Sequence, residues 1–196
     1  TSKYGSTNLE ILQEFKKNTE DNIFNNKLII TPETYFSESP GYQINNFFNT
    51  PFYKNLDNYL NEKNSEIISG IQFYKIYTSA REKSISSNYV RDSIWVDIYN
   101  SSFINSNTDQ IYHKSKLVVG VENLPYKAIL EPILGNLLID FGGTVMSRAT
   151  QQNRAVFKTK SNVLVAPVIC YESMYGEFMT EYVRNGAQLI AIITND

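Results

Sequence analysis

Three side chains with complementary chemistry follow apolar segments of this sequence. They are Glu33 in TPET, Lys114 in YHKSKL and Cys170 in VAPVICYES. A cysteine thiol has an ordinary pKa of about 8.5, so it needs a base or a nearby cation to become a thiolate nucleophile. A carboxylate can accept the proton, and an ammonium can stabilise both the thiolate and an oxyanion. Together the three residue types indicate nucleophilic catalysis at a cysteine.

Each of these residues, taken singly, also has a plainer interpretation. A lone cysteine is most often a small buried hydrophobe, so Cys170 also fits a packing role at the end of a core strand. Glu33 fits a solvated turn, and Lys114, like Lys116, fits a surface lysine. His113 is a rival base, because a cysteine–histidine pair is another nucleophilic arrangement and spacing alone does not dismiss it.

The composition indicates one globular domain. The chain has 196 residues, 42% of them hydrophobic, and a net charge of -2. One cysteine and one histidine are too few for an intramolecular disulfide or a structural zinc site, so we expect no metal and no organic cofactor. The absence of a Lys/Arg cluster argues against nucleic acid as a partner. The sequence also contains neither a membrane-spanning apolar run nor a signal-peptide pattern at residues 1–20.

Apolar periodicity predicts strands that alternate with helices. Thr7 and Glu10 form a capping box at the start of one helix, and Pro51 suits a helix start within residues 44–62. A third helix is predicted at 173–185, with Gly186 as its stop. Strands are predicted at 27–31, 66–74, 94–99, 162–169 and 188–194. The last two are unbroken apolar runs, which is typical of strands buried on both faces. The polar, serine-rich stretch 78–93 is predicted to be an exposed loop.

This alternation predicts a layered α/β domain. Ligands collect at the carboxyl ends of strands in such folds, so we expect Glu33, Lys114 and Cys170 to converge within about one hydrogen-bond length. The chain begins on a helix and ends after a strand that no later element covers. We therefore expect a fragment that lacks material at both ends.

Four segments of this chain, by their order and their residues, resemble the nitrilase (carbon–nitrogen hydrolase) superfamily, whose triad is Glu, Lys and Cys in that order. The segments are TPETYF, YHKSKLVVGVENLPY, APVICYESMYGE and RNGAQLIAIITND. Within the superfamily, the closer resemblance is to the apolipoprotein N-acyltransferase family. Its catalytic lysine is followed by a Leu-Val pair, a Gly and a Glu. The matching residues here are Lys114, Leu117, Val118, Gly120 and Glu122, with Val121 as a modest departure.

The resemblance assigns roles to individual residues. It implies that Cys170 is the nucleophile, Glu33 the general base and Lys114, rather than Lys116, the residue that stabilises the tetrahedral intermediate. It also implies that Glu122 is a supporting carboxylate that orients the site. Tyr171 and Glu172 are implied to lie beside the thiol.

The resemblance also implies a fold and a location. We expect residues 1–196 to form a nitrilase-like four-layer αββα sandwich, truncated at both ends. In the full-length protein this domain is implied to lie on the periplasmic side of the bacterial inner membrane. The membrane helices are implied to be in segments absent from this chain.

Residues 124–139, LPYKAILEPILGNLLI, carry an apolar face at helical spacing. Pro132 favours two short helices over one continuous helix. One interpretation is an ordinary core-facing element. The other is an apolar arm that meets acyl chains or the membrane surface, and the family resemblance favours this arm.

The leading functional interpretation is an acyltransferase that carries a fatty acyl group on Cys170 as a thioester. The implied donor is a phospholipid, and the implied acceptor is the N-terminal amine of a diacylglyceryl-cysteine lipoprotein. One alternative is a soluble amidase or nitrilase with the same triad and water as the acceptor. A second alternative is a non-catalytic binding module, in which Glu33, Lys114 and Cys170 do not meet.

Overall fold

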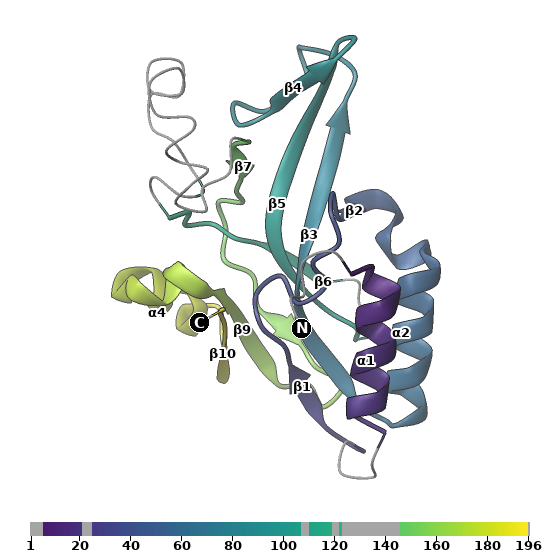
Figure 1. Ribbon diagram of the computed structural model, residues 1–196. Coiled ribbons are helices and arrows are strands. Elements are labelled where there is room, and N and C mark those ends of the chain that lie inside the picture. Colours follow the sequence, from purple (N-terminus) through teal and green to yellow (C-terminus); the bar gives the residue numbers. More distant parts are fainter. Residues whose placement is uncertain (1–5, 21–24, 107–109, 119–121, 123–145, 196) are drawn as a thin grey trace.

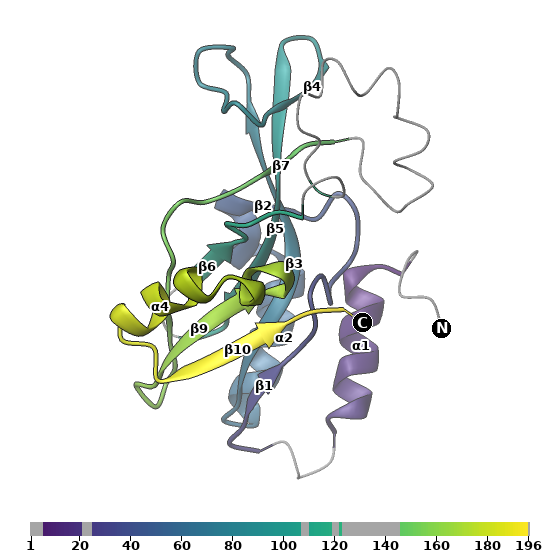
Figure 2. The same cartoon turned by 90° about the vertical axis from the view of Figure 1, so that its left-hand side faces the viewer.

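The computed structural model describes residues 6–20, 25–106, 110–118, 122 and 146–195, which form four layers (Figure 1). Helices α1 (Asn8–Asn18) and α2 (Pro51–Glu62) cover one face of a seven-stranded sheet, and a three-stranded sheet packs on the other face. Helix α4 (Gly176–Arg184) lies on the outer side of the smaller sheet, as Figure 2 also shows. The predicted α/β class and the order helix, sheet, sheet, helix are confirmed.

The direction of the strands in the larger sheet brings two candidate residues to the same end. Its central strands are β3 (Glu66–Tyr77) and β5 (Ile94–Ile104), which pair antiparallel. Strand β1 (Leu28–Ile30) pairs parallel to β3, and β6 (Gln110–His113) pairs antiparallel to β5. Strands β1 and β6 therefore run in the same direction. Glu33 and Lys114, which follow these strands, lie beyond the same end of the sheet.

Three short strands complete the larger sheet. They are β2 (Tyr42–Gln43) beside β3, and β4 (Asn88–Arg91) and β7 (Arg148–Ala149) beside β5. Strand β4 lies inside the stretch 78–93, so the prediction of a plain exposed loop there is wrong. Ser84 and Ser87 each donate a hydrogen bond to the buried carboxylate of Asp97, at 2.8 and 2.6 Å. These two serines thus hold this stretch against β5 through hydrogen bonds to a buried carboxylate.

The smaller sheet carries the cysteine. Its order is β10 (Leu189–Ile193), β9 (Leu164–Ile169) and β8 (Phe157–Lys158), with β9 and β10 parallel. Strand β9 is buried on both faces as predicted. The same prediction for β10 is wrong, because Leu189, Ile190 and Ile192 are exposed. Strand β10 is the edge of this sheet within the described residues, and the face that carries Ile190 and Ile192 is exposed.

The three predicted helices are confirmed with small changes at their ends. Helix α1 begins with the predicted capping box, in which Glu10 N donates to Thr7 Oγ1 at 3.2 Å and Thr7 N donates to Glu10 Oε2 at 2.7 Å. The segment 44–62 divides into the 3-10 helix η2 (Ile44–Asn49) and α2, which begins at Pro51. The 3-10 helix η3 (Cys170–Met174) precedes α4. Gly186, the predicted stop, lies just after the end of α4 and has φ +88°.

Two apolar clusters hold the layers together. An aromatic-rich cluster lies between α1, α2 and the larger sheet and includes Phe36, Phe47, Phe73 and Phe103. The second cluster lies between the two sheets and under α4, and it includes Ile68, Ile104, Val168 and Phe178. Removing such large apolar side chains from water is the main favourable contribution to folding. The clusters therefore fix the strand ends from which the candidate residues project.

Three further expectations concern an apolar segment, a membrane-spanning helix and a metal site. Residues 124–139, predicted to be an apolar element or arm, lie outside the described residues. Among the residues that the structure describes, no helix has the length and apolar character needed to cross a membrane. The described residues also contain no group of three or more His, Cys, Asp or Glu side chains arranged to hold a metal ion.

Candidate active site

Glu33 occupies a tight turn directly after β1. Pro32 interrupts the strand, and Thr34 adopts a left-handed backbone conformation with φ +46°. The turn presses against Gly70 of β3. A Cβ atom at Gly70 would lie 2.5 Å from Pro32 O and 2.7 Å from Glu33 Cα, so only glycine permits this approach. The sequence thereby seats a mostly buried carboxylate on the face of β3.

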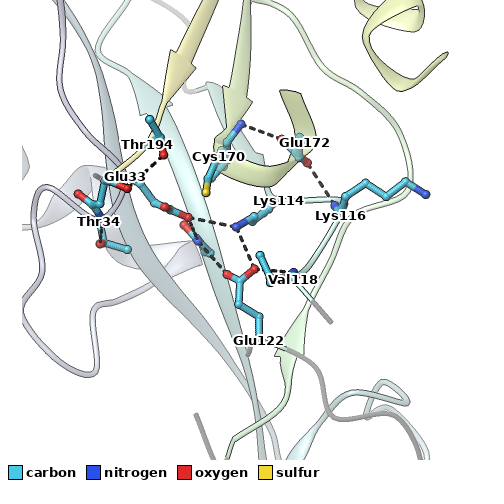
Figure 3. Close-up of polar contacts among 12 residues, drawn as sticks. Glu33, Thr34, Lys114, Lys116, Val118, Glu122, Cys170, Glu172 and Thr194 are labelled. Atoms are coloured by element: carbon cyan, nitrogen blue, oxygen red, sulfur yellow. Dashed lines mark hydrogen bonds and ion pairs between the residues drawn. The ribbon is translucent and has the colours of Figure 1, made fainter. Parts of the chain in front are cut away.

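Lys114 is a buried cation held between two carboxylates (Figure 3). Its side chain is 1% exposed, and its Nζ lies 3.1 Å from Glu33 Oε1 and 2.9 Å from Glu122 Oε2. Burial acts to lower the pKa of Lys114, but Glu122 and Glu33 together outweigh burial and raise that pKa. The ammonium therefore stays charged inside the protein. The predicted meeting of Glu33 and Lys114 is present in the structure.

Glu122 is the second carboxylate that contacts the lysine. Its Oε2 also accepts a hydrogen bond from Val118 N at 3.0 Å, which ties the carboxylate to the chain just after the lysine. Burial acts to raise the pKa of Glu122, whereas Lys114 and the hydrogen bonds lower it, and the net direction is downward. Glu122 is consequently an ionised partner of Lys114, in the supporting position that the sequence analysis gave it.

Cys170 stands where β9 ends and η3 begins. It adopts φ +47°, which is uncommon for a residue with a side chain, and such conformations concentrate at functional sites. Its side chain is partly exposed, and Figure 3 shows the thiol pointing toward the space between Glu33 and Lys114. The ends of three strands, two from one sheet and one from the other, thus bring Cys170 to the same region as Glu33 and Lys114, and hydrogen-bond contact of the sulfur with these residues stays a prediction.

Glu172 supports this arrangement from inside the protein. It is completely buried, and its Oε1 accepts hydrogen bonds from Tyr112 Oη at 2.7 Å and Ser115 N at 2.6 Å. Lys116 N donates to the same oxygen at 3.3 Å, and Ile169 N donates to Oε2 at 2.8 Å. Burial raises the pKa of Glu172, and these hydrogen bonds oppose the rise. One carboxylate therefore joins the chain just after Lys114 to the chain just before Cys170.

Tyr171 and Lys116 lie at the surface beside the site. Tyr171 is partly exposed and meets Tyr175 edge to face, with ring centroids 5.2 Å apart. Lys116 is exposed, and its Nζ lies 5.9 Å from the centroid of the Tyr175 ring. Because Lys114 contacts both carboxylates and Lys116 contacts neither in the described structure, the geometry distinguishes the two lysines as the sequence analysis expected.

His113 does not fit the role of a rival base. It precedes Lys114 in an extended segment, so the two side chains point to opposite faces of the sheet. The imidazole stacks on Tyr99 at a centroid distance of 4.3 Å, and its Nδ1 lies 2.6 Å from Ser101 Oγ. Burial lowers the pKa of His113 to about 4. The histidine is a neutral packing residue on the side of α1 and α2.

Two polar residues of the site are missing from the sequence analysis. Asn100 of β5 donates through Nδ2 to Glu33 Oε1 at 2.6 Å and to Glu122 Oε1 at 3.2 Å. Arg148 of β7 is near enough to Glu122 and Glu33 for their charges to oppose the lowering of its pKa by burial. The polar triplet NSS inside the apolar strand IWVDIYNSSFI is a signal that could have revealed Asn100. No comparable signal marks Arg148, because β7 has only two residues.

These groups define the class of site as a thiol beside a carboxylate and a buried ammonium, at strand ends of a layered α/β domain. A carboxylate can accept a thiol proton, and a fixed ammonium can stabilise negative charge on a carbonyl oxygen. Two cations, Lys114 and Arg148, balance Glu33 and Glu122. This arrangement suits attack on a carbonyl carbon through a covalent cysteine intermediate.

Three curated proteins named apolipoprotein N-acyltransferase are similar to this chain. The Thermotoga maritima protein is 24% identical over 196 residues, which cover 99% of this chain and 30% of that protein. The Wigglesworthia glossinidia brevipalpis protein is 28% identical over 185 residues, or 94% of this chain and 33% of that protein. The Chlorobaculum tepidum protein is 35% identical over 91 residues, which cover 44% of this chain and 17% of that protein. The resemblance indicated by the motifs is confirmed, and the chain spans a third or less of each relative's length.

Two solved structures superpose on most of this chain at low sequence identity. Glutamine-dependent NAD+ synthetase from Acinetobacter baumannii superposes with a TM-score of 0.46 and 14% identity, over 96% of this chain and 28% of that chain. An amidase of the nitrilase superfamily from Nesterenkonia AN1 superposes with a TM-score of 0.49 and 11% identity, over 95% of this chain and 58% of that chain. No family model matches the chain.

Proposed function

We propose that residues 1–196 form the catalytic domain of an apolipoprotein N-acyltransferase. The observation that carries this proposal is the buried Lys114 ammonium, held between Glu33 and Glu122 at the place toward which the Cys170 thiol points. The names of the three curated relatives support acyl transfer as the reaction.

In the first half-reaction, Glu33 accepts the proton of the Cys170 thiol, and the sulfur attacks the ester carbonyl carbon of a phospholipid. A carbon–sulfur bond forms, and the negative charge on the carbonyl oxygen is stabilised by the Lys114 ammonium. The ester carbon–oxygen bond then breaks, and the departing alkoxide takes the proton from Glu33. The products are a lysophospholipid and an acyl thioester on Cys170.

In the second half-reaction, the N-terminal amine of a diacylglyceryl-cysteine lipoprotein attacks the thioester carbonyl carbon. Glu33 accepts a proton from the amine as the carbon–nitrogen bond forms. The carbon–sulfur bond breaks, and the sulfur regains a proton through Glu33. A thioester suits this sequence because it stores the acyl group in a form that is reactive toward amines.

The proposal places the domain on the periplasmic side of the bacterial inner membrane, where both lipid-bearing substrates reside. The membrane attachment belongs to segments outside this chain, in keeping with its coverage of a third or less of the curated relatives. Residues 124–139 are proposed as the apolar arm that meets the acyl chains.

The test is acyl transfer by the full-length enzyme. Incubation with an acyl-labelled phospholipid and a diacylglyceryl-cysteine peptide is expected to move the label into an amide on the peptide. Cys170→Ser removes the thiolate and is expected to stop this transfer. Steady hydrolysis of small amides or nitriles without transfer would favour the amidase. If neither substrate class reacts, the binding module is the remaining interpretation.

A further inference from the structure

Asn100 contacts three charged residues of the site, namely Glu33, Glu122 and Lys114. It lies on β5, where its Cα pairs with Gln72 of β3, and it is 5% exposed. Its Nδ2 donates to Glu33 and Glu122, and its main-chain oxygen accepts a hydrogen bond from Lys114 N at 2.8 Å. The amide and the ammonium therefore close a ring around the two carboxylates.

The orientation of the Asn100 amide follows from its partners. Both carboxylates accept from Lys114, so both are present as acceptors and only an NH₂ group can bridge them. This leaves Oδ1 facing away from the pair. Asn100 Oδ1 is buried and has no hydrogen-bond partner in the structure. An unpaired buried polar atom calls for an explanation, and here the bridge that Nδ2 makes between the two carboxylates fixes this orientation of the amide.

We propose that Asn100 is a positioning residue, which holds the Glu33 and Glu122 carboxylates against Lys114 in the geometry needed for proton transfer from Cys170. This inference rests on the proposed function, because it assigns Asn100 a part in activating the same thiol. Among the described residues, the charged groups that face the pair are Lys114 from the end of β6 and Arg148 from β7, and the Cys170 thiol faces it from η3. Asn100 supplies a neutral donor to both carboxylates.

The test is the pH dependence of Cys170 reactivity and of acyl transfer in the full-length enzyme. A carboxylate that loses a hydrogen-bond donor holds its proton more tightly. The acid limb of kcat/KM in Asn100→Ala is therefore expected to move up by about one pH unit, with about tenfold lower kcat/KM on that limb. The rate of Cys170 alkylation by iodoacetamide is expected to move in parallel. Asn100→Asp adds a carboxylate and is expected to shift the limb further.

Ser102→Ala is the matched control. Ser102 lies two residues further along β5, is equally buried, and its Oγ also has no partner in the structure. The acid limb of kcat/KM in Ser102→Ala is expected to stay where it is in the unsubstituted enzyme. Asn100→Ser keeps one donor, so its shift is expected to be smaller than that of Asn100→Ala, and it serves as the second variant if Asn100→Asp does not fold.

The two proposals fail in different ways. A limb that stays in place in Asn100→Ala and Asn100→Ser, while only the maximal rate falls, overturns the positioning role and leaves the cysteine mechanism intact. Transfer that continues in Cys170→Ser overturns the proposed function itself, whatever the Asn100 variants do.

Discussion

Lys114→Met is expected to abolish turnover in the full-length enzyme. The substitution removes an ammonium that contacts both Glu33 and Glu122 within 4 Å, and the proposed mechanism places this ammonium beside the developing oxyanion. Loss of such stabilisation commonly costs about 3 to 4 kcal/mol, or roughly a hundredfold to a thousandfold in rate. The two carboxylates left in a buried site then compete for one proton, which lowers the rate further. Steady-state acyl transfer measures the loss.

Lys116→Met is the control, because it makes the same chemical change two residues away. Lys116 is exposed, and its ammonium contacts an aromatic ring rather than a carboxylate. The acyl-transfer rate of Lys116→Met is expected to stay within about threefold of that of the unsubstituted enzyme, since the interactions of exposed charges are weak. Equal losses from the two substitutions, or a larger loss from Lys116→Met, would show that the catalytic lysine is placed wrongly.

Glu172→Gln is expected to lower the free energy of unfolding by about 2 to 4 kcal/mol and to reduce activity with it. Both oxygens of Glu172 accept hydrogen bonds, three of them from backbone N–H groups. A glutamine keeps the shape but presents an NH₂ group where an acceptor is required, so at least one buried donor loses its partner. Because Glu172 joins the lysine segment to the cysteine turn, Lys114 and Cys170 then lose their common support. Chemical denaturation and acyl transfer measure the two effects.

Glu177→Gln provides the matched comparison on the same side of the domain. Glu177 lies in the first turn of α4, and its side chain is exposed. Its substitution is expected to change the free energy of unfolding by no more than about 0.5 kcal/mol. A Glu172→Gln enzyme as stable and active as Glu177→Gln would mean that the buried carboxylate does not organise the site.

The long elements of the fold could be predicted because their local signals agree with their packing. The Thr7 and Glu10 capping box and Pro51 mark helix starts that the structure reproduces, and the apolar run before Cys170 is a strand buried on both faces. The two-residue strands β2, β7 and β8 could not be predicted, since so few residues carry no periodicity. The open face of β10 was also missed, because an apolar run does not reveal how many neighbours a strand has.

The meeting of the candidate residues could be predicted from strand direction and from family motifs. The sequence predicts a strand directly before Glu33, but strand β6 before Lys114 was not predicted, and it is the parallel course of β1 and β6 that places the two residues together. The contacts that hold these residues depend on pairings between distant strands. Asn100 reaches Glu33 across 67 residues of sequence, and Glu172 reaches Ser115 across 57, so neither contact leaves a local pattern.

The central claim is that Cys170 carries the acyl group, and intact mass spectrometry of the full-length enzyme tests it most directly. Incubation with phospholipid and no acceptor is expected to add one fatty-acyl mass to Cys170, because the apolar arm proposed for residues 124–139 is expected to keep water from the thioester until an amine arrives. Hydroxylamine, which cleaves thioesters, is expected to remove the added mass, and Cys170→Ala is expected never to acquire it. An enzyme that transfers acyl groups to the peptide while Cys170 stays unmodified, or while Cys170→Ala remains active, would contradict the account.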